Sequence, residues 1–118
     1  MSEAFLAIEL PSLANKRMHW AAKARLVKQQ RRSAALLMRS LVGDPPSGPM
    51  AITLTRVGAR VLDKDNLAAC FKGAQDGVAD WLGIDDGSPL LDWRYEQRTG
   101  KPHGVRVRIE RAHQETGL

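Results

Sequence analysis

The stretch from Trp20 to Leu41 constrains the fold most, because it contains neither glycine nor proline. It is rich in Ala, Lys, Arg, Gln and Leu, which are strong helix formers. Its apolar residues recur near helical spacing at Leu26, Ala34, Leu37 and Leu41. Basic residues occupy much of the remainder: Lys23, Lys28, Arg31, Arg32 and Arg39. The pattern predicts an amphipathic helix with a basic outer side, which Gly43 ends.

Strand and helix patterns alternate around this helix. Alternating apolar residues predict strands, and Asp63 to Asn66 form a polar corner that opens a second helix running to about Trp81. The predicted strands are Ala4–Leu10, Met50–Val57, Leu90–Arg98 and Val105–Arg111, the last two joined as a hairpin by TGKPHG. The order β-α-β-α-β-β predicts a small α+β layer fold with a single domain.

The second helix carries a buried stripe that Gly83 terminates. The stripe is Leu67, Phe71, Ala74, Val78 and Trp81 or Leu82. Cys70 lies beside this stripe and is interpreted as a small core residue.

The chain has 118 residues, enough for one compact domain, which we place at residues 1–111 with a frayed tail at 112–118. No apolar run approaches the roughly 20 residues of a membrane span. The N-terminal segment carries acids where a signal peptide has basic residues. A single cysteine excludes an internal disulfide and a thiolate zinc cluster. We therefore expect a soluble cytoplasmic domain with no membrane partner.

Charge is segregated along the chain. Lys plus Arg is 18 and Asp plus Glu is 13, giving a net charge of +5. Between Leu10 and Gly43 there are eight basic residues and no acid, whereas residues 63–92 hold seven aspartates against Lys64 and Lys72. A basic chain with one acidic island indicates a polyanionic partner, with a cation bound between protein and polyanion. An ordinary solvated surface is the alternative.

The acidic island has two parts, the corner Asp63-Lys64-Asp65-Asn66 and the loop Asp85-Asp86-Gly87 after the same helix. Mg²⁺ prefers carboxylate oxygens and is often bound through one or two carboxylates plus substrate phosphate. Two aspartates at one corner, with one or two on a loop folded against it, supply such a set. The pattern therefore predicts a Mg²⁺ site, and it leaves open whether Mn²⁺ can replace Mg²⁺.

Other interpretations of the same residues stay open. Asp63 and Asn66 can cap the helix, where a negative side chain also meets the positive end of the helix dipole. The Asp-Asp-Gly sequence alone is typical of a turn. A calcium loop counted from Asp63 does not fit, because Ala68 and Ala74 stand where glycine and glutamate are needed.

Lys72 and Asp76 share a helix face with Asp65. They can form an ordinary ion pair four residues apart, or Lys72 can be a cation beside the metal site that holds a scissile phosphate. The histidines are His19, His103 and His113, and their spacing fits neither nucleophilic catalysis nor a zinc site.

The segment LDKDNLAACFKGAQDGVADWLGIDDGSP resembles the RusA family of Holliday-junction resolvases, which are crossover-junction endodeoxyribonucleases common in phages and prophages. The family pattern is Asp-x-Asp-Asn, a helix with a Lys and an Asp four residues later, and an Asp-Asp loop. Its positions here are Asp63, Asp65, Asn66, Lys72, Asp76, Asp85 and Asp86. The opening strand and LPSLAN with Asn15 are also similar, so the resemblance spans about residues 4–111. Lys72 departs from the pattern, following Asp65 by seven residues where the best-known member type has four.

The resemblance implies a RusA-like homodimer that nicks opposed strands of a four-way DNA junction, using Mg²⁺ to activate water. Asp63, Asp65 and Asp86 would be catalytic metal ligands, with Asp85 as an extra ligand and Lys72 as a catalytic cation. Asn66 and Asp76 would support them. DNA would be held by basic and polar residues, among them Asn15, Lys16, Arg17, Lys23, Arg25, Lys28, Arg31, Arg56 and Arg60, together with the C-terminal hairpin.

Two other classes remain open at this stage. One is a non-catalytic basic DNA-binding module, in which the aspartates only cap helices. The other is a metal-dependent nuclease that prefers flaps or other branched DNA, since branch selectivity depends on dimer geometry.

Overall fold

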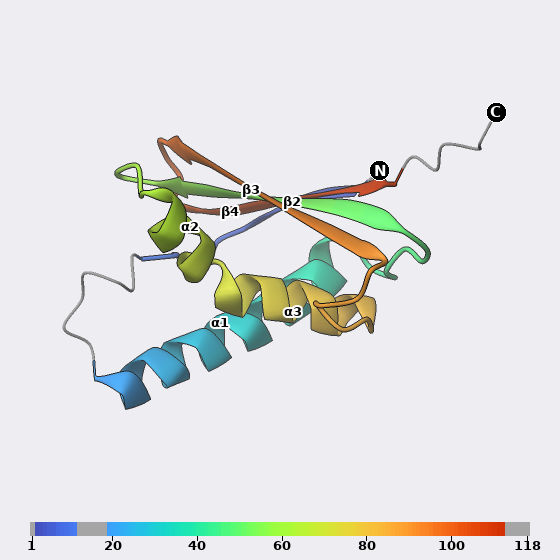
Figure 1. The fold of residues 1–118 in the computed structure, drawn as a ribbon, viewed down its shortest axis with the longest axis horizontal. Helices are drawn as coiled ribbons and strands as arrows, with labels where there is room; N and C mark the ends of the chain where they lie inside the picture. Colours follow the sequence, from blue (N-terminus) through green and yellow to red (C-terminus); the bar gives the residue numbers. More distant parts are fainter. Residues whose placement is uncertain (1, 12–18, 113–118) are drawn as a thin grey trace.

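The computed structural model describes residues 2–11 and 19–112. They form a small α+β domain with a mixed sheet on one side and helices on the other (Figure 1). This confirms the prediction of a small α+β domain. The elements are β1 (Ser2–Leu6), α1 (Trp20–Leu41), β2 (Met50–Gly58), α2 (Lys64–Cys70), α3 (Lys72–Leu82), β3 (Leu91–Thr99) and β4 (Gly104–Arg111).

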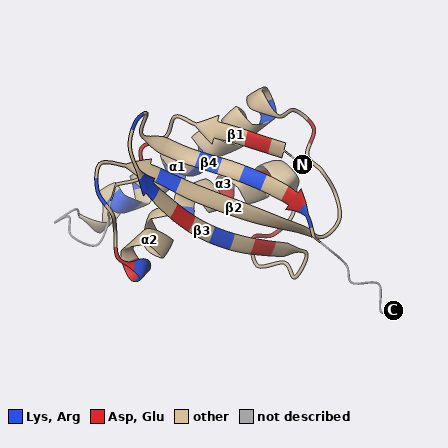
Figure 2. Ribbon diagram, turned by 90° about the horizontal axis from the view of Figure 1, so that it is seen from above, with Lys and Arg blue, Asp and Glu red and all other residues tan. Residues whose placement is uncertain are grey.

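The sheet order is β1-β4-β2-β3, so the predicted hairpin of the last two strands is wrong. β2 lies between them, parallel to β3 and antiparallel to β4. In Figure 2, β3 and β1 form the two opposite edges of the sheet. β2 takes the centre because it is the most buried strand, with Arg56 as its only charged residue. The short connection between β3 and β4 passes the end of β2, where the Gly100 N–H donates to the Gly58 carbonyl at 3.1 Å.

The predicted second helix is divided in two at Phe71. The ring of Phe71 is fully buried and stacks on Tyr95 with 5.2 Å between centroids. Its N–H donates at 3.3 Å to the Ala68 carbonyl, three residues back, where an α-helical N–H bonds four residues back, and α3 begins at the next residue. The buried stripe itself is confirmed, because Leu67, Phe71, Ala74, Val78, Trp81 and Leu82 all lie in the core.

The observed ends of helices and strands agree best with the predicted ones where the local sequence signals are strong. α1 has the predicted bounds, and its cap is His19, whose Nδ1 accepts from the Ala21 N–H at 3.3 Å. β1 ends at Leu6, earlier than predicted, because the Ile8 N–H turns back to the Leu6 carbonyl. Asn15, Lys16, Arg17 and the tail after residue 112 lie outside the described residues.

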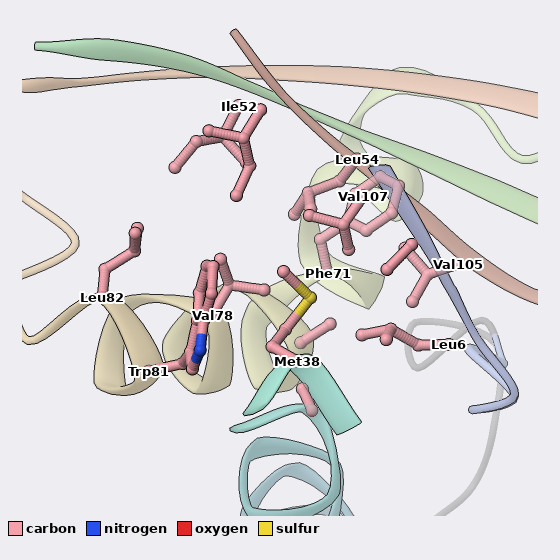
Figure 3. Packing of buried hydrophobic residues seen from close by; sticks show 14 of the residues in the cluster. Leu6, Met38, Ile52, Leu54, Phe71, Val78, Trp81, Leu82, Val105 and Val107 are labelled. Carbon is pink, nitrogen blue, oxygen red and sulfur yellow. The ribbon is translucent and has the colours of Figure 1, made fainter. Parts of the chain in front are cut away.

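The core fills the space between one sheet face and the helices (Figure 3). Leu54 and Val107 from the sheet face Met38 of α1 and Phe71, all fully buried. α1 comes unusually close to α3 at Gly77, where an added Cβ would lie 2.3 Å from the Arg31 carbonyl oxygen. This close crossing places the basic side of α1 beside the acidic end of α3.

In the part of the chain that the structure describes, no helix is long and apolar enough to cross a membrane.

Candidate functional site

A groove of about 1390 Å³ runs between α1 on one side and α2 and α3 on the other. Its α1 wall is basic and is built from Lys23, Lys28, Arg31 and Arg32. Its opposite wall carries Lys72, Gln75, Asp76, Asp80, Asp86 and Tyr95. Alanines and Leu36 supply an apolar floor. The fold therefore brings predicted DNA-binding residues next to part of the acidic island.

The corner before α2 is built as predicted, and Asp63 caps the helix. One carboxylate oxygen of Asp63 accepts from the Asn66 backbone N–H at 2.9 Å, and the other accepts from the Asn66 side-chain amide at 3.1 Å. The capping interpretation of Asp63 is thus confirmed. Asp65 lies exposed in the first turn of α2, where its negative charge interacts favourably with the positive end of the helix dipole.

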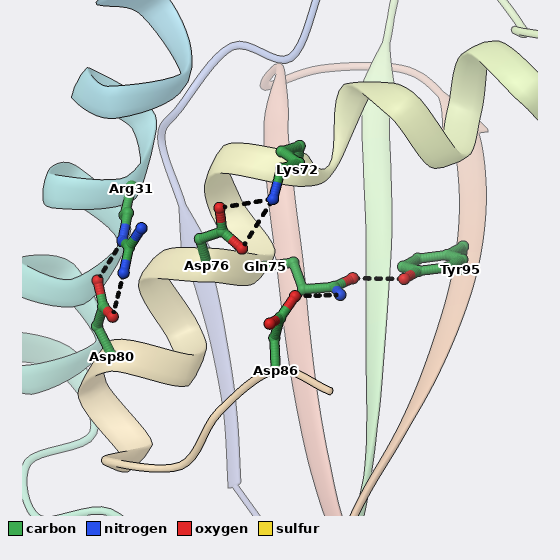
Figure 4. Close-up of polar contacts among 7 residues, drawn as sticks. All are labelled: Arg31, Lys72, Gln75, Asp76, Asp80, Asp86 and Tyr95. Carbon is green, nitrogen blue, oxygen red and sulfur yellow. Dashed lines mark hydrogen bonds and ion pairs between the residues drawn. The ribbon is translucent and has the colours of Figure 1, made fainter. Parts of the chain in front are cut away.

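Asp86 is held from two sides (Figure 4). The Gln75 amide donates to its carboxylate at 3.4 Å, and the Gln75 carbonyl oxygen accepts from the Tyr95 hydroxyl. The Trp93 indole N–H donates to the Asp86 backbone carbonyl at 2.8 Å. Burial raises the pKa of Tyr95, and the negative charge of Asp86 raises it further, so the hydroxyl stays protonated and donates. Asp85 is exposed in a turn, where its carbonyl accepts from the Ser88 N–H.

Two ion pairs line the groove. Lys72 contacts Asp76 at 3.1 Å, which confirms the expected pair on one helix. Arg31, predicted to bind DNA, donates two hydrogen bonds to Asp80 at 2.6 and 2.8 Å and so links α1 to α3. The Arg31 hydrogen bonds lower the pKa of Asp80. Much of the charge of Arg31 is therefore neutralised within the chain.

The two parts of the acidic island are anchored at different points along β3. The Gln97 side chain bonds both the N–H and the carbonyl of Leu62, next to Asp63, at 2.8 and 2.7 Å. Asp86 is fixed instead at Trp93, four residues earlier, a spacing of about 13 Å along a strand. Among residues 2–11 and 19–112, no three His, Cys, Asp or Glu gather to hold a metal ion. The corner before α2 and the Asp86 loop are therefore attached to β3 four residues apart.

The remaining predicted DNA contacts fall into two groups. Lys23, Arg25 and Lys28 lie on α1, and Arg60 is exposed after β2. Arg56 is different, because it is buried and donates to the backbone carbonyls of Leu10 and Arg60, each at 2.8 Å. Its prediction as a DNA contact is wrong, since a strand at the sheet centre turns this guanidinium inward to bond loop carbonyls.

Sequence reasoning missed the roles of Gln75 and Tyr95 and the pairing of Asp80 with Arg31. A signal for Tyr95 existed, because the core-facing positions of β3 change from Leu91 and Trp93 to Tyr95 and Gln97. Polar groups on the core side of a strand need hydrogen-bond partners. The partner of Asp80 depends on how α1 crosses α3, which no local pattern specifies.

A comparison with known proteins finds a relative of part of this chain. An uncharacterized protein of Xylella fastidiosa (strain Temecula1) is 38% identical over 78 residues, which cover 61% of this chain and 51% of that protein. The match thus spans about half the length of the relative. No protein-family model matches the chain. No solved structure matches it either.

Proposed function

We propose that this chain is a Mg²⁺-dependent, structure-selective endodeoxyribonuclease of the RusA type, with a RusA-like fold. It would act as a homodimer in the cytoplasm and resolve four-way DNA junctions by paired nicking in recombination and repair. The observation that carries the proposal is the groove in which the basic wall of α1 faces Asp76 and Asp86. Such a groove can bind a phosphate backbone on one wall and hold acidic groups against it on the other.

The basic wall supports a nucleic-acid partner. Lys23 and Lys28 lie along α1 at the groove, and lysines so placed neutralise phosphates and release counterions. Contacts of this kind position the protein on DNA without reading its sequence. Arg31 adds less to binding, because Asp80 already occupies its guanidinium.

The aspartate carboxylates support metal-dependent chemistry, because carboxylate oxygens are ligands that Mg²⁺ prefers. Mg²⁺, when bound, neutralises phosphate charge and lowers the pKa of a bound water. Asp63, Asp65 and Asp86 remain the proposed ligands, with Asp85 beside them. Asn66 fixes the Asp63 carboxylate by two hydrogen bonds, and Asp76 holds the ammonium of Lys72 toward the groove, where it can meet a phosphate.

A second candidate, a non-catalytic basic DNA-binding domain, is favoured by one observation. Both carboxylate oxygens of Asp63 accept hydrogen bonds from Asn66 at the start of α2, as those of a purely structural aspartate would. In that case the acidic residues would only stabilise helix ends and balance charge.

Cleavage by the Asp65→Asn variant separates the two candidates. Purified protein is incubated with Mg²⁺ or Mn²⁺ and labelled four-way, flap and linear duplex DNA of matched sequence. We expect wild type to cut the four-way junction, chelator to abolish cutting, and Asp65→Asn to reduce the rate by several orders of magnitude. Junction binding by Asp65→Asn should persist or tighten, because one negative charge facing phosphates is removed.

The matched control is Asp44→Asn, which changes an exposed aspartate after α1. Asp80→Asn is unsuitable, because it also breaks the bond to Arg31. Wild type that binds but never cuts branched DNA would refute the nuclease and leave the binding domain. Preferential cutting of flaps would refute junction selectivity.

A further inference from the structure

Two hydrogen bonds in series attach the Asp86 side chain to the rest of the domain (Figure 4). The Gln75 amide donates to one carboxylate oxygen of Asp86, Oδ2, at 3.4 Å. The carbonyl oxygen of the same amide accepts from the Tyr95 hydroxyl. Gln75 belongs to α3, Tyr95 belongs to β3, and Asp86 lies in the loop between them. This hydrogen-bond network therefore connects a loop carboxylate to a helix and a strand.

The chemistry of the three groups fixes the direction of the network. An ionised carboxylate has only acceptors, so Asp86 requires a donor from Gln75. An amide carries its N–H donors at one end and its acceptor oxygen at the other, so the carbonyl then faces Tyr95, which donates. The bond from Gln75 to Asp86 is long, and the entropy lost on ordering a glutamine side chain is comparable with what one hydrogen bond contributes. Both bonds are therefore needed to hold the amide.

Both ends of the network are fixed independently. The Tyr95 ring stacks on fully buried Phe71, with 5.2 Å between the ring centroids, so the core sets the position of the hydroxyl. At the other end, the Trp93 indole N–H donates to the Asp86 backbone carbonyl at 2.8 Å. Trp93 thus holds the backbone of the loop, and Gln75 holds the side chain.

The donor that holds Asp86 differs from those of the other groove aspartates. Within the described part of the chain, three aspartates line the groove. Lys72 is paired with Asp76 at 3.1 Å. Arg31 is paired with Asp80 at 2.6 Å. Asp86 instead accepts from a neutral amide, which orients a carboxylate without cancelling its charge. Its negative charge therefore remains available to attract a cation in the groove.

We propose that Gln75 and Tyr95 are positioning residues for Asp86: Tyr95 sets the orientation of the Gln75 amide, and the amide holds Oδ2 so that Oδ1 is left for a divalent cation. A carboxylate held in this way suits Mg²⁺ or Mn²⁺, which bind carboxylate oxygens. Partners that orient a metal ligand typically change metal affinity or activity by about 10–100-fold. The role of Asp86 as a metal ligand rests on the proposed function, whereas the orientation of its carboxylate does not.

Nuclear magnetic resonance of isotope-labelled protein tests the network without DNA or metal. The side-chain N–H signals of Gln75 are identified by their loss in Gln75→Met. In wild type they should exchange slowly with solvent, and Tyr95→Phe, which keeps the ring but removes the hydroxyl, should move them to the values of an exposed glutamine. The Trp93 indole signal should stay in place, because it reports the loop backbone. Unchanged Gln75 signals, or loss of the Trp93 signal, in Tyr95→Phe would overturn the network.

Mn²⁺ binding and cleavage test the positioning role. Free Mn²⁺ is measured by electron paramagnetic resonance without DNA, and cleavage is measured in single turnover at saturating junction. Gln75→Met and Tyr95→Phe should each weaken Mn²⁺ binding and slow cleavage by about 10–100-fold, with little change in Tm or in junction affinity in chelator. The double variant should be no worse than Gln75→Met, because Tyr95 acts only through Gln75. Gln29→Met, the same substitution at an exposed position of α1, is the control and should behave as wild type.

The outcomes separate this proposal from the nuclease itself. Additive losses in the double variant, or wild-type Mn²⁺ affinity in either single variant, would overturn the positioning role. An equal loss of junction affinity and cleavage would also overturn it, because Gln75 and Tyr95 would then act in DNA binding. A wild type that neither binds Mn²⁺ nor cuts DNA would refute the proposed nuclease and the metal-ligand role of Asp86. The magnetic resonance result would still decide whether Tyr95 and Gln75 orient its carboxylate.

Discussion

Replacing Gly77 with alanine tests whether the close crossing of α1 and α3 is real and required. An added Cβ would lie 2.3 Å from the Arg31 carbonyl oxygen and 2.6 Å from the Ala34 Cβ. Carbon atoms in contact prefer about 3.5–4.0 Å, so α1 would have to move away by roughly 1 Å. The obstacle is helix backbone, which cannot rotate aside as a side chain can.

Two effects of opposite sign decide the free energy of unfolding. Alanine in a helix interior is more favourable than glycine by about 1 kcal/mol. Overpacking a tight core contact costs about 1–3 kcal/mol. Because backbone atoms form the contact, we expect the overpacking cost to exceed the helix-propensity gain by about 1 kcal/mol. The free energy of unfolding then falls by that amount, and Tm falls by about 4 °C for a domain of this size.

Differential scanning calorimetry measures this change, with Gly87→Ala as the control. A Cβ at Gly87 would lie 3.5 Å from the Asp85 carboxylate, an ordinary contact, so Tm should be unchanged or slightly raised. Gly77→Ala should also weaken DNA binding, because α1 forms the basic groove wall. A higher Tm for Gly77→Ala would refute the close crossing, since only the helix-propensity gain would then remain.

Three further predictions concern charge and burial. Replacing both Lys23 and Lys28 with alanine should reduce the slope of log K against log salt for junction binding by about two units, because each lost phosphate contact removes about 0.9 from the slope. An unchanged slope in a salt titration would place the DNA-binding surface elsewhere. Arg56→Met should destabilise the fold by about 1–3 kcal/mol in urea unfolding, because two loop carbonyls lose their buried donor, whereas Arg39→Met on exposed α1 should change stability little. Burial raises the pKa of the Cys70 thiol to about 11, so iodoacetamide should label the native protein far more slowly than the unfolded one at pH 8–9. Because the folded state favours the neutral Cys70 thiol, this thiol stabilises the fold less as the pH rises from its usual pKa toward 11, and its full contribution is present below that range. Rapid labelling of the native protein would contradict the burial of Cys70.

Local patterns predicted the helices and the acidic corner well. The Gly- and Pro-free stretch gave both ends of α1, and Asp63 followed by Asn66 marked the start of α2. These features depend on neighbours within one or two turns, so composition and spacing specify them. The contacts of Gln75 with Asp86 and Tyr95 depend on β3 lying beside α3, which is tertiary information.

The strand order was missed because adjacency along the chain favours a hairpin. The residues carried a contrary signal. β2 has Arg56 as its only charged residue, as expected of a central strand, whereas β3 alternates charged residues at Asp92, Arg94 and Glu96. Alternating charge along a strand is typical of a protected sheet edge. β4 also alternates charged residues, at Arg106, Arg108 and Glu110, yet it lies inside the sheet, so this signal alone does not specify the strand order.

The position of β3 also explains why one chain keeps its acidic groups apart. In the unit from β2 to β3, the two strands are parallel, so the loop leaving β2 and the loop entering β3 lie at opposite ends of the pair. Asp63 and Asp65 follow the first loop, and Asp85 and Asp86 belong to the second. No adjustment of side chains reverses that order. The topology of the β2–β3 unit therefore fixes which end of this strand pair carries each acidic group.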